Sequence, residues 1–112
     1  MLAFFDTSGG GLATLAASIA KHRGLEASAS TNALATRQEV SSALAEIGVT
    51  PCEAREVGAA PAGAIVVGAA GEIAARLYEG PAETPFGDAS LERIALARIA
   101  RDTIERWLEQ RA

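Results

Sequence analysis

The spacing of apolar residues at the start of the chain predicts a strand, a flexible turn and a helix. Residues 2–5 form a short apolar run that stops at Asp6, and the sequence then reads Thr-Ser-Gly-Gly-Gly over residues 7–11. Glycines allow backbone conformations that other residues avoid, so this stretch predicts a turn. Apolar residues then recur with helical spacing at Leu12, Leu15, Ala16 and Ile19. We expect a helix with one buried face that ends near Arg23 and Gly24.

A second strand and helix are expected next. Residues 25–29 are compatible with a short strand, although alanine and serine are weak strand formers. Thr36 and Glu39 have the spacing of a capping box, in which the two side chains bind the free amides at the start of a helix. The apolar stripe that follows comprises Val40, Ala43, Leu44 and Ile47. The pattern predicts a helix that Gly48 ends.

The second half of the chain predicts one more clear strand and a long closing helix. Residues 64–67 are a continuous apolar run between two glycines, typical of a strand covered on both faces. A helix is expected at about residues 72–78, and prolines and glycines predict a loop over residues 79–87. From about residue 90 a single apolar face is expected to contain Leu96, Ile99, Ala100, Ile104, Trp107 and Leu108.

This order of elements predicts an α/β fold in a single domain, residues 1–112. We expect a three-layer sandwich with a short parallel sheet of four strands, three of them clear, joined by right-handed crossovers with helices on both faces, as in flavodoxin-like folds. The chain has 112 residues, of which 49% are hydrophobic and 21% charged, a composition typical of one packed core.

Charge and cysteine content narrow the classes of partner. The net charge is −4 and the basic residues are dispersed among acids, so we expect no nucleic-acid partner. No apolar run approaches the roughly 20 residues that cross a bilayer, and no basic leader is apparent, so no membrane partner and a cytoplasmic location are expected. Cys52 is the only cysteine, which excludes an intramolecular disulfide, and its acidic neighbour Glu53 favours an inert thiol.

The glycine turn is the candidate binding site. In parallel sheets, ligands bind beyond the carboxyl ends of the strands, and a turn that opens a helix presents unpaired amides and a positive dipole end. Backbone donors can hold an anion whatever the side chains are. The candidate anion-binding residues are Thr7, Ser8, Gly9, Gly10, Gly11, Leu12 and Ala13.

The chain resembles the low-molecular-weight protein tyrosine phosphatases and the arsenate reductases that share their fold. Residues 4–13 match the position of that family's strand and Cys-x5-Arg-Ser loop. Weaker similarities follow in order at residues 28–31, 43–49, 64–68, 84–87 and 101–104, so the resemblance spans nearly the whole chain. It implies a phosphotyrosine phosphatase I-like version of the α/β sandwich.

The residues that carry the chemistry of that family are missing from this chain. Asp6, Leu12 and Thr84 stand where the family has its nucleophilic cysteine, its phosphate-binding arginine and its general-acid aspartate. The resemblance therefore implies a catalytically inactive relative that binds a small anion or a partner protein at the turn, as a monomer or a weak homodimer. We expect no cofactor and no metal, because His22 and Cys52 have no companions with ligand spacing.

Alternatives remain open at the sequence level. Asp6 could act as a nucleophile with a bound magnesium ion, but such enzymes carry a second carboxylate where this chain has Ser8. Asp6 could instead cap the glycine turn, and the three glycines could serve only to turn the chain. A hydrolase with an atypical site and a flavodoxin-like nucleotide- or flavin-binding module are the other candidates. Trp107 is expected in the core or at a dimer contact.

Overall fold

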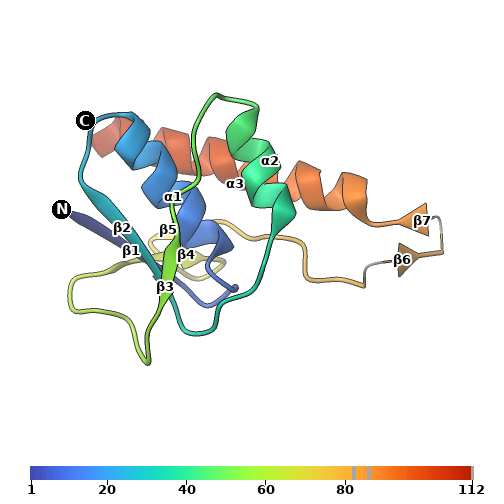
Figure 1. Ribbon diagram of the computed structural model, residues 1–112, viewed down its shortest axis with the longest axis horizontal. Helices are drawn as coiled ribbons and strands as arrows, with labels where there is room; N and C mark the ends of the chain where they lie inside the picture. The colour runs from blue at the N-terminus through green and yellow to red at the C-terminus, as the bar shows by residue number, and fades with distance from the viewer. Residues whose placement is uncertain (82, 86, 112) are drawn as a thin grey trace.

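A computed structural model describes residues 1–81, 83–85 and 87–111, and Figure 1 shows its arrangement. The main sheet is parallel throughout, with strand order β3-β2-β1-β4-β5. Its strands are β1 Leu2–Asp6, β2 Ala27–Thr31, β3 Ala54–Glu56, β4 Ile65–Gly68 and β5 Ile73–Ala74. The helices are α1 Gly11–His22, α2 Gln38–Ala45 and α3 Ser90–Arg111. A separate antiparallel pair joins β6 Glu83–Thr84 and β7 Gly87–Asp88.

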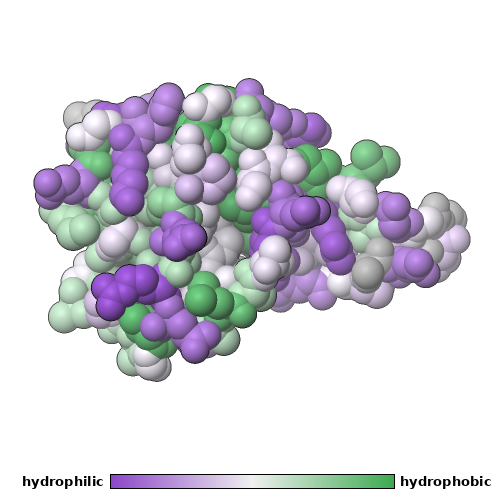
Figure 2. Space-filling model, viewed as in Figure 1, coloured by the Kyte–Doolittle hydropathy of each residue, from purple (hydrophilic) through white to green (hydrophobic). Residues whose placement is uncertain are grey.

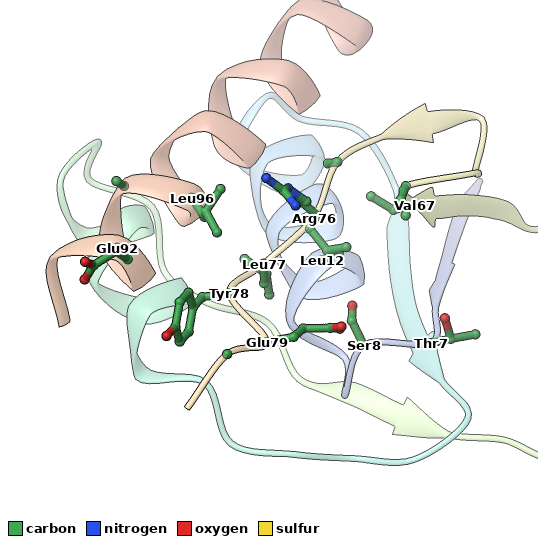
Figure 3. Close-up of a pocket in the computed structure, with 15 residues that line it drawn as sticks. Thr7, Ser8, Leu12, Val67, Arg76, Leu77, Tyr78, Glu79, Glu92 and Leu96 are labelled. Atoms are coloured by element: carbon green, nitrogen blue, oxygen red, sulfur yellow. The ribbon is translucent and has the colours of Figure 1, made fainter. Parts of the chain in front are cut away.

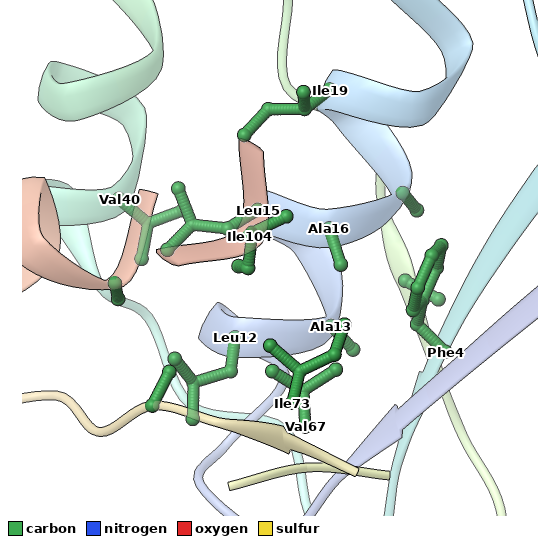
Figure 4. Packing of buried hydrophobic residues seen from close by; sticks show 14 of the residues in the cluster. Phe4, Leu12, Ala13, Leu15, Ala16, Ile19, Val40, Val67, Ile73 and Ile104 are labelled. Carbon is green, nitrogen blue, oxygen red and sulfur yellow. The ribbon is translucent and has the colours of Figure 1, made fainter. Parts of the chain in front are cut away.

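The α/β class and the parallel sheet are confirmed, but the helices of the described residues pack on one face of the sheet. Phe4, Ile65 and Val67 join a core to which all three helices contribute, for example through Leu15, Leu44 and Ile104 (Figure 4). Neighbouring strand residues point the other way, and Val66 is 39% exposed. The second helical layer that the sequence predicted is therefore not found in the described part of the chain.

The connection between β3 and β4 explains the missing layer. A right-handed crossover that returns from β3 past β1 to β4 must run over the face opposite α1. In this chain that crossover is the stretch 57–64, which contains Gly58, Pro61 and Gly63 and forms no helix. Glycine and proline disfavour helix, so this face has only a loop to cover it.

The sheet has more strands than the four predicted. β3 is a three-residue edge strand that pairs with β2, and β5 adds the opposite edge beside β4. The resulting order differs from the 2-1-3-4-5 order of flavodoxin-like sheets and equals that of the first five strands in dinucleotide-binding sheets. In either arrangement the order reverses beside β1, here between β1 and β4.

The helix predicted at residues 72–78 is wrong. Ile73, Ala75 and Leu77 are buried while Ala74 and Arg76 are exposed, which is the alternation of extended backbone. The segment pairs with β4 as β5 and then continues without a helix to Gly80. The strand predicted at 25–29 is present but lies two residues later, as β2.

The helices at 11–22 and 90–111 are confirmed, whereas the predicted capping box is wrong. Arg37 precedes α2 as its N-cap residue and makes no side-chain capping bond, and Glu39 forms an ion pair with Arg37 at 3.6 Å. The helix ends at Ala45, three residues before Gly48. No helix of the described residues has the length and apolar character needed to cross a membrane.

The buried face of α3 is close to the predicted one, with one exception. Ala100, Ile104 and Leu108 are buried, and Trp107 packs edge-on against Phe4 with ring centroids 6.2 Å apart. Ile99 is 60% exposed, because the core-facing position in that turn is Ala100. The expectation that Trp107 contributes to the core is confirmed by its contact with Phe4.

Glu46 links α2 to α3 and predicts a pH effect on stability. Hydrogen bonds from Arg98 and Arg101 lower the pKa of the Glu46 carboxyl from 4.5 to about 2. Because this pKa is depressed in the folded state, the stabilisation is complete above the unfolded value and is lost as the pH falls toward about 2. We expect Glu46→Gln to lower stability at pH 7 but to have little effect near pH 2, measured by urea unfolding.

Glu53→Gln is the control for this pH effect, since Glu53 is exposed and no ion pair involves it in the described residues. It should change stability little at either pH. A Glu46→Gln penalty of equal size at pH 7 and near pH 2 would contradict the ion-pair explanation.

Candidate functional site

The Asp6 side chain lies inside the glycine turn and binds its amides. Asp6 has 0% exposure, and its Oδ1 accepts hydrogen bonds from the amides of Ser8 at 3.1 Å and Gly10 at 2.9 Å. Its Oδ2 accepts a third from the amide of Ala13 at 2.7 Å, in the first turn of α1. A buried carboxylate that receives several backbone bonds beside a helix N-terminus is well stabilised. The interpretation of Asp6 as a cap of the turn is confirmed.

The three glycines of the turn are required by the chain segments that pack against them. A Cβ atom on Gly9 would lie 2.8 Å from the Ala35 Cβ, and one on Gly11 would lie 2.7 Å from a Leu77 methyl. Gly9 and Gly10 also have positive φ angles of 84° and 95°. The amide of Ala35 donates to the Gly9 carbonyl at 2.9 Å, which fixes one of these close approaches. Packing and backbone geometry therefore account for the glycine run without a ligand.

A crevice opens beside this turn, at the place where the strand order reverses. Its volume is about 820 Å³. One side comes from the turn after β1 and from the end of β4, and the other from the extended segment 75–80 and the N-terminal half of α3 (Figure 3). In parallel sheets this position, beyond the carboxyl ends of strands at a reversal of order, is where ligands bind.

The crevice combines apolar walls with a small number of polar groups. The half-buried Leu96 provides apolar surface next to the buried side chains of Leu12 and Leu77, and Thr7, Arg76 and Glu79 provide hydroxyl and charged groups. In Figure 3 Ser8 points from the turn toward Leu12, and the Glu79 side chain reaches toward Ser8. The Ser8 Oγ and the Thr31 Oγ1 on β2 are buried, and neither has a hydrogen-bond partner among the residues that the structure describes. Such a mixture is typical of small-molecule sites.

Tyr78 closes one end of the crevice and is held from several sides. Its hydroxyl donates to the Pro81 carbonyl at 2.8 Å, and its own carbonyl accepts from Arg37 Nη1 at 2.6 Å. The Arg93 guanidinium lies 5.7 Å from the ring centroid. A Cβ on Gly80 would lie 2.5 Å from the Tyr78 hydroxyl, so a larger residue there would displace the Tyr78 ring. This wall of the crevice is therefore preorganised.

The structure separates the residues that the sequence placed in one site. Leu12 and Ala13 are buried in the core, although Leu12 also borders the crevice. Thr84 belongs to β6, in the hairpin that projects from the start of α3 in Figure 1. Arg76 and Leu77 were missed because a helix was predicted at 72–78, and Glu79 was assigned only to the loop that follows it. The apolar alternation of Ile73, Ala75 and Leu77 was the signal that could have found them.

The remaining candidates for chemistry lie apart from the crevice. His22 is exposed at the end of α1, and Cys52 is half-buried beside α1, where its amide donates to Ser18 Oγ at 2.9 Å. Within residues 1–81, 83–85 and 87–111, no group of three or more His, Cys, Asp or Glu side chains could hold a metal ion.

Comparison of the chain with protein-family models, curated proteins and solved structures finds no match. The resemblance to the small phosphatases thus stays a prediction from the sequence. A functional proposal therefore rests on the geometry of the crevice and of the glycine turn.

Proposed function

We propose that this domain is a binding module without phosphatase activity, and that it holds a small organic molecule in the crevice between the Asp6 turn and the segment 75–80. The observation that carries the proposal is the crevice itself, with its apolar walls and its polar groups at a reversal of strand order. Its volume of about 820 Å³ is within the range of small-molecule sites.

The filled turn favours this crevice over the loop amides as the binding site. Three amide donors of the turn and of the first turn of α1, those of Ser8, Gly10 and Ala13, already bind the Asp6 carboxylate and are not available to an anion. A second anion would also be placed next to that negative charge, which opposes binding. The turn therefore supports the crevice wall and leaves ligand contact to side chains.

A small ligand suits the surface better than a protein partner does. On the face shown in Figure 2, hydrophilic residues separate the apolar ones, which occur in small groups. Protein interfaces are generally broader and have a continuous buried centre. The concave site beside Leu12 and Leu77 is instead matched to a compact molecule.

Absence of phosphatase activity is the first test. A nucleophile must reach phosphorus, but Asp6 has 0% exposure and both of its oxygens accept amide hydrogen bonds. We expect no hydrolysis of p-nitrophenyl phosphate above the buffer rate between pH 5 and pH 8, with or without magnesium. The matched control is Asp6→Asn, which should give the same rate as the unaltered protein. Hydrolysis by the unaltered protein that Asp6→Asn abolishes would reject this part of the proposal.

Binding in the crevice is tested with a small-molecule panel that includes neutral fragments, amino acids, dipeptides and nucleotides. We expect at least one class to give saturable amide shifts in ¹H–¹⁵N spectra at residues 7–8, 67–69 and 75–80.

Ala95→Trp places a large ring at an exposed α3 position that borders the crevice, and should weaken this binding at least tenfold. Ala62→Trp, at an exposed position in the 57–64 loop, is the control that should leave it unchanged. Shifts confined to the amides of Ser8, Gly10 and Ala13 on addition of phosphate would favour the turn instead.

A further inference from the structure

Three charged side chains that line the crevice, Arg76, Glu79 and Glu92, have no ion-pair partner among the described residues. Arg76 and Glu79 lie on the same extended segment, and no ion pair involves either of them in the described residues. Three of the other arginines are engaged, since Arg98 and Arg101 bind Glu46 and Arg111 binds Glu72. Opposite charges that border one concavity and remain unpaired are available to a ligand.

The Arg76 and Glu79 side chains lie in different parts of the crevice in Figure 3. Arg76 and Glu79 are three residues apart in extended backbone, which separates their Cα atoms by up to about 10 Å. Figure 3 shows Arg76 beside Leu12, whereas Glu79 extends to the other side of the crevice beside Ser8. A ligand that carries both a cation and an anion can therefore bridge them, which a ligand of a single sign cannot do.

We infer that the crevice binds a small zwitterion with an apolar side chain, of amino-acid or dipeptide size, with its carboxylate at Arg76 and its ammonium group at Glu79. This inference rests on the proposed binding function of the same crevice. The apolar side chain would contact the half-buried Leu96, beside the buried side chains of Leu12 and Leu77.

Charge balance excludes the simpler ligand classes. A lone anion would leave the Glu79 carboxylate unpaired and repelled, and a lone cation would do the same to the Arg76 guanidinium. Nucleotides with several phosphates would need more cations than Arg76, while Glu79 and Glu92 add negative charge at the same crevice. A zwitterion pairs with both Arg76 and Glu79 through charge-assisted hydrogen bonds.

The test compares one dipeptide with its two singly blocked forms. Leucyl-leucine, its N-acetyl derivative and its C-terminal amide are titrated by calorimetry and followed in ¹H–¹⁵N spectra. We expect the free dipeptide to bind with crevice shifts, and each blocked form to bind at least tenfold more weakly, because each lacks one charged contact.

The variants Arg76→Gln and Glu79→Gln assign each end of the ligand. Arg76→Gln should remove the preference for a free carboxylate and keep the preference for a free amine, and Glu79→Gln should do the reverse. Both positions are exposed, so the variants are expected to fold, which circular dichroism checks. Exposed Arg55→Gln, away from the crevice, is the control and should change neither preference.

The outcomes distinguish this inference from the proposed function. If the blocked forms bind as tightly as the dipeptide, or if only neutral fragments or nucleotides shift the crevice amides, the zwitterion assignment is overturned while small-molecule binding stands. If no probe in the panel shifts those amides, both are overturned.

Discussion

Asp6→Ala is expected to destabilise the domain by about 3–5 kcal/mol, a loss comparable to removal of one partner from a buried charged pair. The substitution leaves the amides of Ser8, Gly10 and Ala13 without their acceptor. It also removes a carboxylate that has 0% exposure, so water cannot replace it without entering the core. The effect should appear as a lower midpoint in urea or thermal unfolding.

A small carboxylate supplied from solution makes this test specific. Formate has the charged group of Asp6 and fits the space that the alanine variant vacates, so we expect it to raise the stability of Asp6→Ala in a saturable way. It should have no comparable effect on the unaltered protein, whose turn is filled.

Two further variants distinguish the loss of stability caused by removing the Asp6 carboxylate from the general effect of a substitution. Asp6→Asn retains one carbonyl acceptor and should cost less than Asp6→Ala, because one oxygen that accepts an amide becomes a donor. Asp102→Ala, at a side chain with 61% exposure, should change stability by about 0.5 kcal/mol or less. Equal small losses for Asp6→Ala and Asp102→Ala would show that the turn does not depend on the carboxylate.

The sequence predicted the layout of the central elements well, because their patterns are long or unambiguous. The strand that ends at Asp6, the helix that follows it and the closing helix each have an apolar pattern that matches the observed burial. The three-residue β3 is too short for periodicity to show, and the alternation at Ile73, Ala75 and Leu77 extends beyond the two residues of β5 that pair. Their pairing depends on neighbouring strands, which a local pattern does not contain.

The candidate site was predictable in position but not in chemistry. Glycines after a strand marked the turn, and the turn does border the crevice through Thr7 and Ser8. Whether its amides face a ligand or the chain's own carboxylate depends on how Asp6 is oriented, and the sequence permitted both. The opposite wall, segment 75–80, was not predicted because the apolar residues near Ile73 and Leu77 fit a short helix as well as a strand.

The segment 75–80, which the sequence did not predict as a wall of the crevice, follows a short connection between β4 and β5. Gly71 makes that connection possible. Parallel neighbours are usually joined by a dozen or more residues, but here only residues 69–72 separate the two strands. A Cβ on Gly71 would lie 2.4 Å from the Val66 carbonyl oxygen and 3.0 Å from the Gly68 nitrogen. Both contacts are with backbone, which cannot rotate away as a side chain would.

Gly71→Ala is therefore expected to cost about 1–3 kcal/mol, the range for insertion of an atom where no space exists. Because the displaced connection leads directly into Ile73 and Leu77, amide shifts should extend through 73–80, and ligand binding in the crevice should weaken with stability. Gly68→Ala is a matched control three residues away, since nothing lies within 4 Å of a Cβ at that position. Urea unfolding of the two variants provides the comparison. Similar stabilities for both would mean that the β4–β5 connection is looser than this geometry requires, and the crevice wall would then owe its position to Tyr78 and its contacts rather than to the turn.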